Sequence, residues 1–208
     1  MKEITEIVKQ KMTEIDQSSS RDNGLPPNLQ RKKETIIAKY GDLMNFCRTF
    51  NPQRQVEFCA NKERCFFGTA PTLADLNMAY AKTAARFWLQ YQILDLCRYA
   101  NVKTMSDMQV EELAAIISLK YYWLKTTELM YFFFQMKSAE YGKFYGSIDP
   151  MEVMAALKKF ITFRGETYEK KYQQELSDRE ASWKKTAISY HEYQKLLTQE
   201  KENGNTDK

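Results

Sequence analysis

The chain has 208 residues, of which 43% are hydrophobic and 13% aromatic, so it can fold around a sizeable core. It contains only 7 glycines and 5 prolines, too few for the many tight turns of a β-rich fold. Its net charge of +4 is modest, and permits an acidic partner without requiring one.

The composition also bears on where the protein resides. No run of about 18 apolar residues is present, so we expect no membrane-spanning helix and no membrane partner. The N-terminus alternates charged and apolar residues and lacks the apolar centre of a secretion signal. The four cysteines (Cys47, Cys59, Cys65 and Cys97) follow no framework spacing, so we expect free thiols in a reducing, cytoplasmic compartment.

The first third of the chain shows two helical patterns. Residues 2–16 are predicted to form a short amphipathic helix, with apolar residues at Ile4, Ile7, Val8, Met12 and Ile15. A polar stretch that contains Gly24, Pro26 and Pro27 follows and reads as a linker. A second helix is predicted over 29–50, interrupted only by Gly41, and residues 51–71 are predicted to be an irregular connection.

A strong helix start follows that connection. Thr72 is a favoured N-cap residue, and Asp75 three positions later completes the pattern of a capping box. The helix that it opens is predicted to run to about Asn101. Apolar residues occur on more than one side of it, so we expect this helix to be central and buried.

Three more helix starts follow in order. Ser106 is predicted to cap a helix that runs to about Tyr122, and either Thr126 or Thr127 to cap the next. Residues 141–148 read as a turn-rich link between helices. Asp149 and Pro150 then open a long C-terminal helix, because proline is tolerated at the first helical position.

Together these patterns predict an all-α protein, a helical bundle of about five to seven helices with a long C-terminal helix. We divide it into an N-terminal helix and linker (1–24), a helical core domain (25–165), a C-terminal helical extension (166–200) and a disordered tail (201–208).

Recognisable catalytic chemistry is missing from the sequence. His191 is the only histidine, so histidine-based metal clusters and Ser-His-Asp arrangements are not expected. No glycine-rich phosphate loop follows a strand, and no carboxylate pair sits in an apolar setting. We therefore expect a protein without enzymatic activity, cofactor or metal.

Segment 29–70 is the most basic part of the chain, with eight lysines and arginines against four carboxylates, a net charge of +4. Phe58, Phe66 and Phe67 are interleaved with these charges, as in proteins that bind single-stranded nucleic acid. The alternative is a solvated helix face followed by a loop that its phenylalanines pin into the core. The candidate nucleic-acid contacts, with one from the later turn, are Arg31, Lys32, Lys33, Arg54, Lys62, Arg64 and Lys143.

Two further features are aromatic. In the turn, Tyr141, Phe144 and Tyr145 either form a stacking platform or fold back over the helices that the turn joins. The C-terminal helix carries a candidate interaction stripe at Tyr168, Tyr172, Leu176, Trp183, Tyr190 and Leu197. Such a stripe must be covered, and its spacing leaves open whether its own bundle, a second copy or another protein covers it.

Three sequence runs carry a resemblance to a known family. The first runs from Cys65 to Leu76 and contains Pro71-Thr72-Leu73; the second contains Phe87-Trp88-Leu89 and Asp95-Leu96; the third and most specific extends from Tyr122 to Asp149-Pro150. Over about residues 60–165 the chain resembles an uncharacterised family encoded by prophages and conjugative elements of anaerobic gut bacteria.

The resemblance implies mobile-element biology and cytoplasmic residence, and it brings no catalytic or binding residues with it. We therefore expect a non-enzymatic accessory protein of a mobile element. It would act through protein contacts, with the replication or transfer machinery as partner, and through DNA as a further alternative. The other hypothesis is a structural protein that self-assembles as a homo-oligomer through its C-terminal helix.

Overall fold

The structure is a computed structural model, and it describes residues 25–186 and 192–195. The predicted helix over 2–16 and most of the linker after it lie outside the described residues, as do His191, Tyr190, Leu197 and the predicted tail 201–208.

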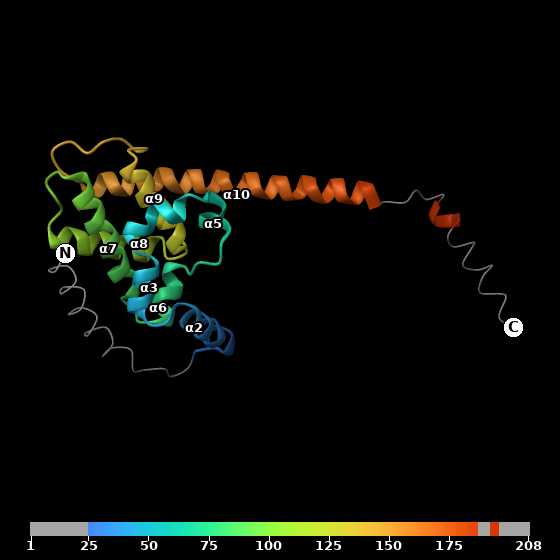
Figure 1. Cartoon of the computed structure of the whole chain (residues 1–208), viewed down its shortest axis with the longest axis horizontal. Coiled ribbons are helices and arrows are strands. Elements are labelled where there is room, and N and C mark those ends of the chain that lie inside the picture. The colour runs from blue at the N-terminus through green and yellow to red at the C-terminus, as the bar shows by residue number, and fades with distance from the viewer. Residues whose placement is uncertain (1–24, 187–191, 196–208) are drawn as a thin grey trace. The chain divides into compact units, whose positions relative to one another are not determined.

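The all-α prediction is confirmed, and so is the long C-terminal helix (Figure 1). Residues 25–186 form nine α-helices, which are α2 (Pro27–Tyr40), α3 (Leu43–Thr49), α4 (Gln55–Cys59), α5 (Lys62–Phe67), α6 (Leu73–Ala79), α7 (Ala84–Ala100), α8 (Asp107–Lys120), α9 (Thr126–Lys137) and α10 (Pro150–Thr186). A short 3-10 helix, η1 (Pro52–Arg54), precedes α4. Within residues 25–186, extended pairing is limited to two isolated bridges, Thr72 with Lys125 and Lys103 with Ser147.

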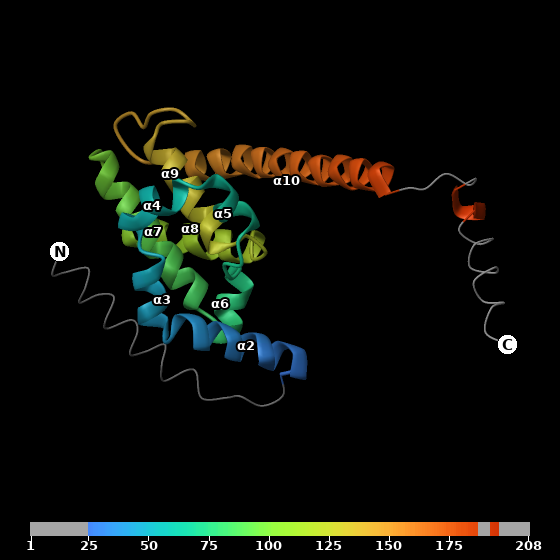
Figure 2. The ribbon, with the colours of Figure 1, turned by 45° about the vertical axis from the view of Figure 1, so that its right-hand side comes forward.

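The chain divides into two compact units, residues 1–161 and residues 162–208, and the boundary falls inside α10. In the first unit α7 is central and packs against α6, α8 and α9, while α9 also packs against α4 and α5. Helix α2 lies across α6 and α3 (Figure 2). The largest fully buried side chains of this core are Trp88, Phe46, Phe66, Phe132, Phe133 and Phe160.

Several predicted helix starts are confirmed at the atomic level. The Thr72 hydroxyl accepts a hydrogen bond from the Asp75 amide at 3.2 Å, and the Asp75 carboxylate accepts one from the Thr72 amide at 3.0 Å. Ser106 and Gln109 form the same capping box at α8. Helix α10 begins at Pro150, and the Asp149 carboxylate accepts a hydrogen bond from the Met151 amide at 2.7 Å. These starts depend on neighbouring residues alone.

The helix predicted over 29–50 is wrong in its continuity, because it is divided at Gly41. Gly41 has a φ of +74°, in the left-handed region that glycine adopts without steric cost. Asp42 then caps α3, since its side chain accepts a hydrogen bond from the Asn45 amide at 2.7 Å. Two helices meet at an angle here because a cap follows directly after the glycine.

The helix predicted from Thr72 to about Asn101 is also two helices, although its expected burial is confirmed for α7. Helix α6 ends at Ala79, and the backbone turns before α7 begins at Ala84. The side chain of Asn77 accepts a hydrogen bond from the Ala85 amide at 2.9 Å, so an α6 residue satisfies a donor at the start of α7. A tertiary contact therefore stabilises this break, which has no glycine or proline.

Two smaller predictions are also wrong. Residues 51–71 are mainly helical, because Asn51 caps η1 and Asn61 caps α5 with their side chains. Neither Thr126 nor Thr127 caps α9, since Lys125 occupies the N-cap position and both threonines lie inside the helix. The Thr127 hydroxyl instead donates a hydrogen bond to the Cys65 carbonyl at 2.7 Å.

Candidate functional site

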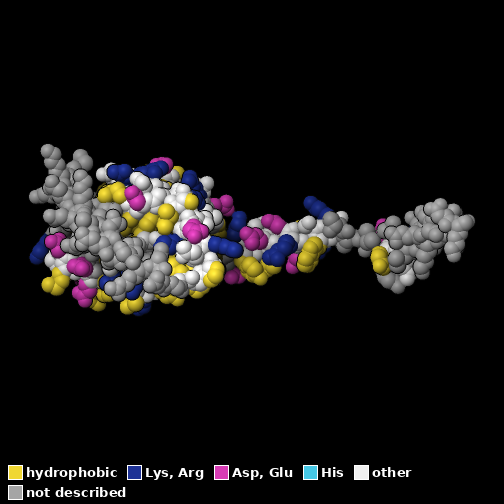
Figure 3. Space-filling view, turned by 90° about the horizontal axis from the view of Figure 1, so that it is seen from below, with side chains coloured by type: hydrophobic (Ala, Val, Ile, Leu, Met, Phe, Trp, Pro, Cys, Tyr) yellow, Lys and Arg dark blue, Asp and Glu magenta, His cyan; other side chains and the backbone are white. Residues whose placement is uncertain are grey.

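The C-terminal part of α10 carries the predicted interaction stripe on a solvent-exposed helix. Tyr172 is 52% exposed and Trp183 is 69% exposed, while Tyr168 and Leu176 are half-buried. None of the described residues from 162 to 185 is buried. In Figure 3, hydrophobic side chains lie along one edge of this helix beside charged side chains of both signs. We refer to Tyr168, Tyr172, Leu176 and Trp183 as the α10 stripe.

A second exposed apolar surface lies on α8 and was not predicted. Met108 is 76% exposed, Leu119 is 79% exposed and Ile116 is 42% exposed, with Ala115 half-buried between them. The opposite side of α8 is buried through Val110, Leu113, Ala114 and Ile117. The sequence signal was present, because apolar residues occupy both sides of α8. We refer to Met108, Ala115, Ile116 and Leu119 as the α8 face.

The seven predicted nucleic-acid contacts are distributed over separate elements, and some already have acidic partners. Lys32 lies 2.7 Å from the carboxylate of Asp75, which joins α2 to the N-terminus of α6. Arg54 donates two hydrogen bonds to Glu57, at 2.7 and 2.8 Å. This pair raises the pKa of Arg54 through the hydrogen bond to Glu57, and lowers the pKa of Glu57 for the same reason.

Of the seven predicted nucleic-acid contacts, Arg54 and Arg64 share one aromatic ring. The guanidinium groups of Arg54 and Arg64 both lie over the Phe58 ring, at 5.3 and 5.6 Å from its centroid. Lys62 lies 5.9 Å from the centroid of Phe66. Arg31 and Lys33 belong to α2, and Lys143 to the link between α9 and α10.

The phenylalanines of residues 51–71 pack into the core, which was the structural alternative to nucleic-acid binding. Phe66 is fully buried, Phe58 is 8% exposed, and Phe67 is half-buried. Phe66 packs edge-on against Tyr131 and also contacts Phe160. Their rings therefore pin α4 and α5 into the core, and they do not form an exposed stacking surface.

The aromatic side chains of the link 141–148 differ in their burial. Tyr141 packs on Phe132 and donates a hydrogen bond to Gln135 at 2.6 Å, and its burial raises its pKa. Phe144 is half-buried, whereas Tyr145 is 86% exposed. The link is held to the residues before α8 by two backbone hydrogen bonds of Lys103, with Gly146 and Ile148.

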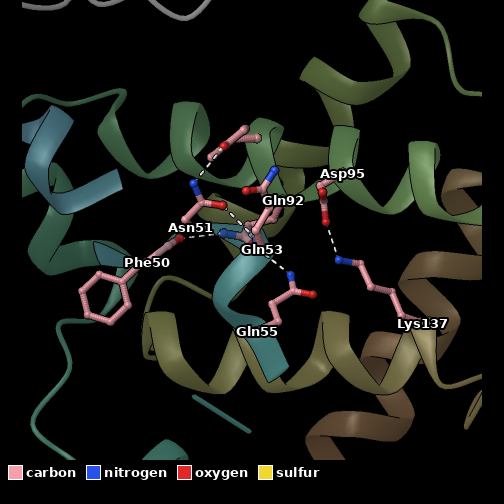
Figure 4. A network of polar contacts seen from close by, with 8 residues as sticks. Phe50, Asn51, Gln53, Gln55, Gln92, Asp95 and Lys137 are labelled. Atoms are coloured by element: carbon pink, nitrogen blue, oxygen red, sulfur yellow. Dashed lines mark hydrogen bonds and ion pairs between the residues drawn. The ribbon is translucent and has the colours of Figure 1, made fainter. Parts of the chain in front are cut away.

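A buried polar network fixes η1 and α4 against α7 (Figure 4). The carbonyl of Phe50 accepts hydrogen bonds from the Trp88 indole and from the Gln92 amide, each at 3.0 Å. The Gln92 carbonyl in turn accepts one from Gln55 at 2.7 Å. Asn51 donates to the Tyr91 hydroxyl at 3.2 Å. The Gln55 side-chain oxygen is buried without a hydrogen-bond partner, whereas the bonds named above join backbone and side-chain groups of the chain itself, so the network has a structural role.

The four cysteines are free thiols, as predicted, and all four are buried. Burial raises the pKa of Cys47 to about 12, and the nearby Asp42 carboxylate adds to the increase. The hydrogen bond that Cys59 shares with Cys65, together with burial, raises the pKa of Cys59. Cys47 and Cys59 are therefore expected to react slowly at neutral pH, because the thiolate is the nucleophile. The same hydrogen bond lowers the pKa of Cys65.

The described residues offer neither a metal-ligand cluster nor a membrane-spanning helix. No three or more His, Cys, Asp or Glu side chains within residues 25–186 and 192–195 are grouped as metal ligands. In the same part of the chain, no helix combines the length and apolar character needed to cross a bilayer.

Comparison with known proteins gives a match to a protein family. The chain matches no curated protein and no solved structure. The family match covers about half of the chain, and the matched residues include both the α8 face and the α10 stripe. An origin in mobile elements stays a prediction. Residues 103–205 are similar to a family of unknown function, DUF6633.

Proposed function

We propose that this protein is a non-enzymatic accessory protein that acts by binding another protein chain through the α10 stripe. The observation that carries the proposal is the exposure of Tyr172 and Trp183, at 52% and 69%, on the same side of one helix. Tryptophan and tyrosine are the residues most enriched at the energetic centres of protein interfaces.

The spacing of the stripe supports a helical mode of binding. Tyr168, Tyr172 and Leu176 follow at intervals of four residues, and Trp183 lies seven residues after Leu176. At about 100° per residue these side chains fall within one sector of α10. Exposed aromatic and apolar side chains gathered on one side of a helix are unfavourable in water unless a partner covers them.

The cellular context of the proposal comes from the resemblance over residues 60–165. That resemblance to proteins of prophages and conjugative elements supports a protein of the replication or transfer machinery as the partner. Contact with DNA is part of the same proposal, supported by the +4 charge of segment 29–70. Since Lys32 and Arg54 are paired with carboxylates, such a contact would depend mainly on Arg31, Arg64 and Lys143.

The test is a co-purification with a matched control. Wild type, a Tyr172→Ala/Trp183→Ala variant and a Lys170→Ala/Lys185→Ala variant are expressed in the natural host, together with a differently tagged second copy. Lys170 and Lys185 lie on the opposite side of α10. We expect wild type and the lysine variant to retain the same proteins, and the aromatic variant to lose them. Equal retention by all three would contradict the proposal.

DNA contact is tested separately by gel shift at low salt with single- and double-stranded DNA. Changing Arg31, Arg64 and Lys143 to Ala is expected to weaken binding and to lower its salt dependence, because fewer phosphates are neutralised. Unchanged binding by this variant would remove these residues from the DNA contact.

A further inference from the structure

We propose that the α10 stripe of one copy pairs in an antiparallel direction with the α8 face of a second copy, and that two such contacts form a symmetric dimer. This inference rests on the proposed function, because it names the chain that the stripe binds. It also accounts for the second exposed apolar surface, which the stripe alone leaves unexplained.

The two surfaces have the same spacing. The outward positions of α8 are Met108, Glu112, Ala115 and Leu119, and those of α10 are Tyr172, Leu176, Arg179 and Trp183. Both sets advance by four, three and four residues, which is the alternation of core positions in a helix pair. All eight side chains are exposed or half-buried in the single chain. Each helix therefore presents one seam of matching length.

The charges select the direction of the pairing. In the antiparallel direction Glu112 meets Arg179, so that the single anion of one seam faces the single cation of the other. Ala115, the smallest residue, then meets Leu176. In the parallel direction Glu112 would face Leu176, and Arg179 would face Ala115, which leaves both charges without a partner. Charge complementarity thus favours the antiparallel pair.

The remaining two layers are apolar in the antiparallel direction. Met108 meets Trp183 and Leu119 meets Tyr172; the first pair is 76% and 69% exposed in the single chain, and the second 79% and 52%. Methionine adapts its shape to an aromatic ring and makes favourable sulfur contacts with it. Covering these four exposed side chains removes apolar surface of both helices from water.

Parallel pairing of α10 with α10 is less favourable. Glu175 and Glu180 flank Leu176 on either side of the stripe. In a parallel pair of identical helices these flanking positions meet across the interface, so Glu175 would face Glu180 of the second copy. In the α8 pairing, Glu180 meets Gln109 and Glu111 meets Ser182, and Glu175 lies beside Ser118, which is buried in its own chain. The flanks therefore repel in the first arrangement and not in the second.

The experiment measures the mass of the full chain by light scattering over a wide concentration range at low salt. We expect wild type to shift from monomer to dimer as concentration rises. Arg179→Glu and Glu112→Arg are each expected to weaken dimerisation about tenfold or more, because each places like charges in contact. The double variant restores the opposite pair in exchanged positions and is expected to recover most of the affinity. Lys185→Glu, on the opposite side of α10, is the control and leaves the dimer unchanged.

Trp183 provides a second readout in the same samples. Its emission should shift to shorter wavelength as the dimer forms, and the difference from Trp183→Phe isolates it from Trp88 and Trp123. A wild type that stays monomeric, or a double variant no better than the single ones, would overturn the α8 pairing. In either case the proposed function still stands if the Tyr172→Ala/Trp183→Ala variant loses a foreign protein in the co-purification. The proposed function fails if that variant retains the same proteins as wild type.

Discussion

The two parts of α10, residues 150–161 and 162–186, have similar apolar patterns, but they differ in burial. In the first part Val153, Ala156, Leu157 and Phe160 are buried, and Phe160 packs against Phe66 and Phe132. In the second part the apolar residues continue at helical spacing, yet none of the described residues from 162 to 185 is buried. The same periodicity thus builds a core in one unit and an exposed stripe in the other.

This contrast shows what an apolar stripe on a helix means. Apolar periodicity predicts that one side of the helix is removed from water, but it does not predict which chain packs against that side. The first part finds its cover within residues 25–161. For the second part, we infer that the cover comes from another chain.

The largest expected effect contrasts Phe160 with Tyr172. Phe160→Ala should lower the free energy of unfolding by about 3–5 kcal/mol, because it leaves a cavity beside Phe66 and Phe132. Tyr172→Ala, at an exposed site of the same helix, should change it by less than about 0.5 kcal/mol at concentrations where the protein is monomeric. Urea denaturation followed by circular dichroism measures both. Similar losses for the two variants would show that the second part of α10 is also part of the core.

A smaller effect is expected for the buried polar network of the first unit. Gln92→Ala removes the partner of Gln55 and one of the two donors to the Phe50 carbonyl. Leaving a buried amide unpaired costs about 1–3 kcal/mol, so the midpoint of urea denaturation should fall clearly. Gln174→Ala is the matched control, since the Gln174 amide bonds only to exposed Asp178 on its own helix, and no measurable change is expected.

The smallest effect concerns Gly165, which lies inside α10 close to the boundary between the units. A methyl group at this position would meet no atom within 4 Å, and glycine weakens a helix interior. Gly165→Ala should therefore raise stability by about 0.5–1 kcal/mol. A loss of stability would mean that residue 165 is not helical in solution and that α10 is interrupted there.

Much of the fold could be predicted from the sequence because its signals are local. The capping residues Thr72 and Ser106 and the Asp149-Pro150 pair each satisfy or remove backbone donors within one turn. These signals located the starts of α6, α8 and α10 correctly. The break between α6 and α7 could not be found in this way, because it depends on the Asn77 side chain reaching the Ala85 amide.

The candidate site was predicted in part. The stripe at Tyr168, Tyr172, Leu176 and Trp183 followed from helical spacing and lies on an exposed helix. The α8 face was missed because Leu113 and Ile117 point inward while Ile116 and Leu119 point outward. A helix with apolar residues on both sides looks buried in the sequence, and only packing shows which side remains in water.

The sequence by itself determined that this protein is helical, where its strongest helices begin, and that its last helix carries an aromatic stripe. Only the tertiary structure decided that Phe58 and Phe66 are core residues, that Lys32 is tied to Asp75, and that α8 is exposed on one side. Helix formation and capping depend on neighbours within four residues, whereas burial and ion pairing depend on which distant segments meet.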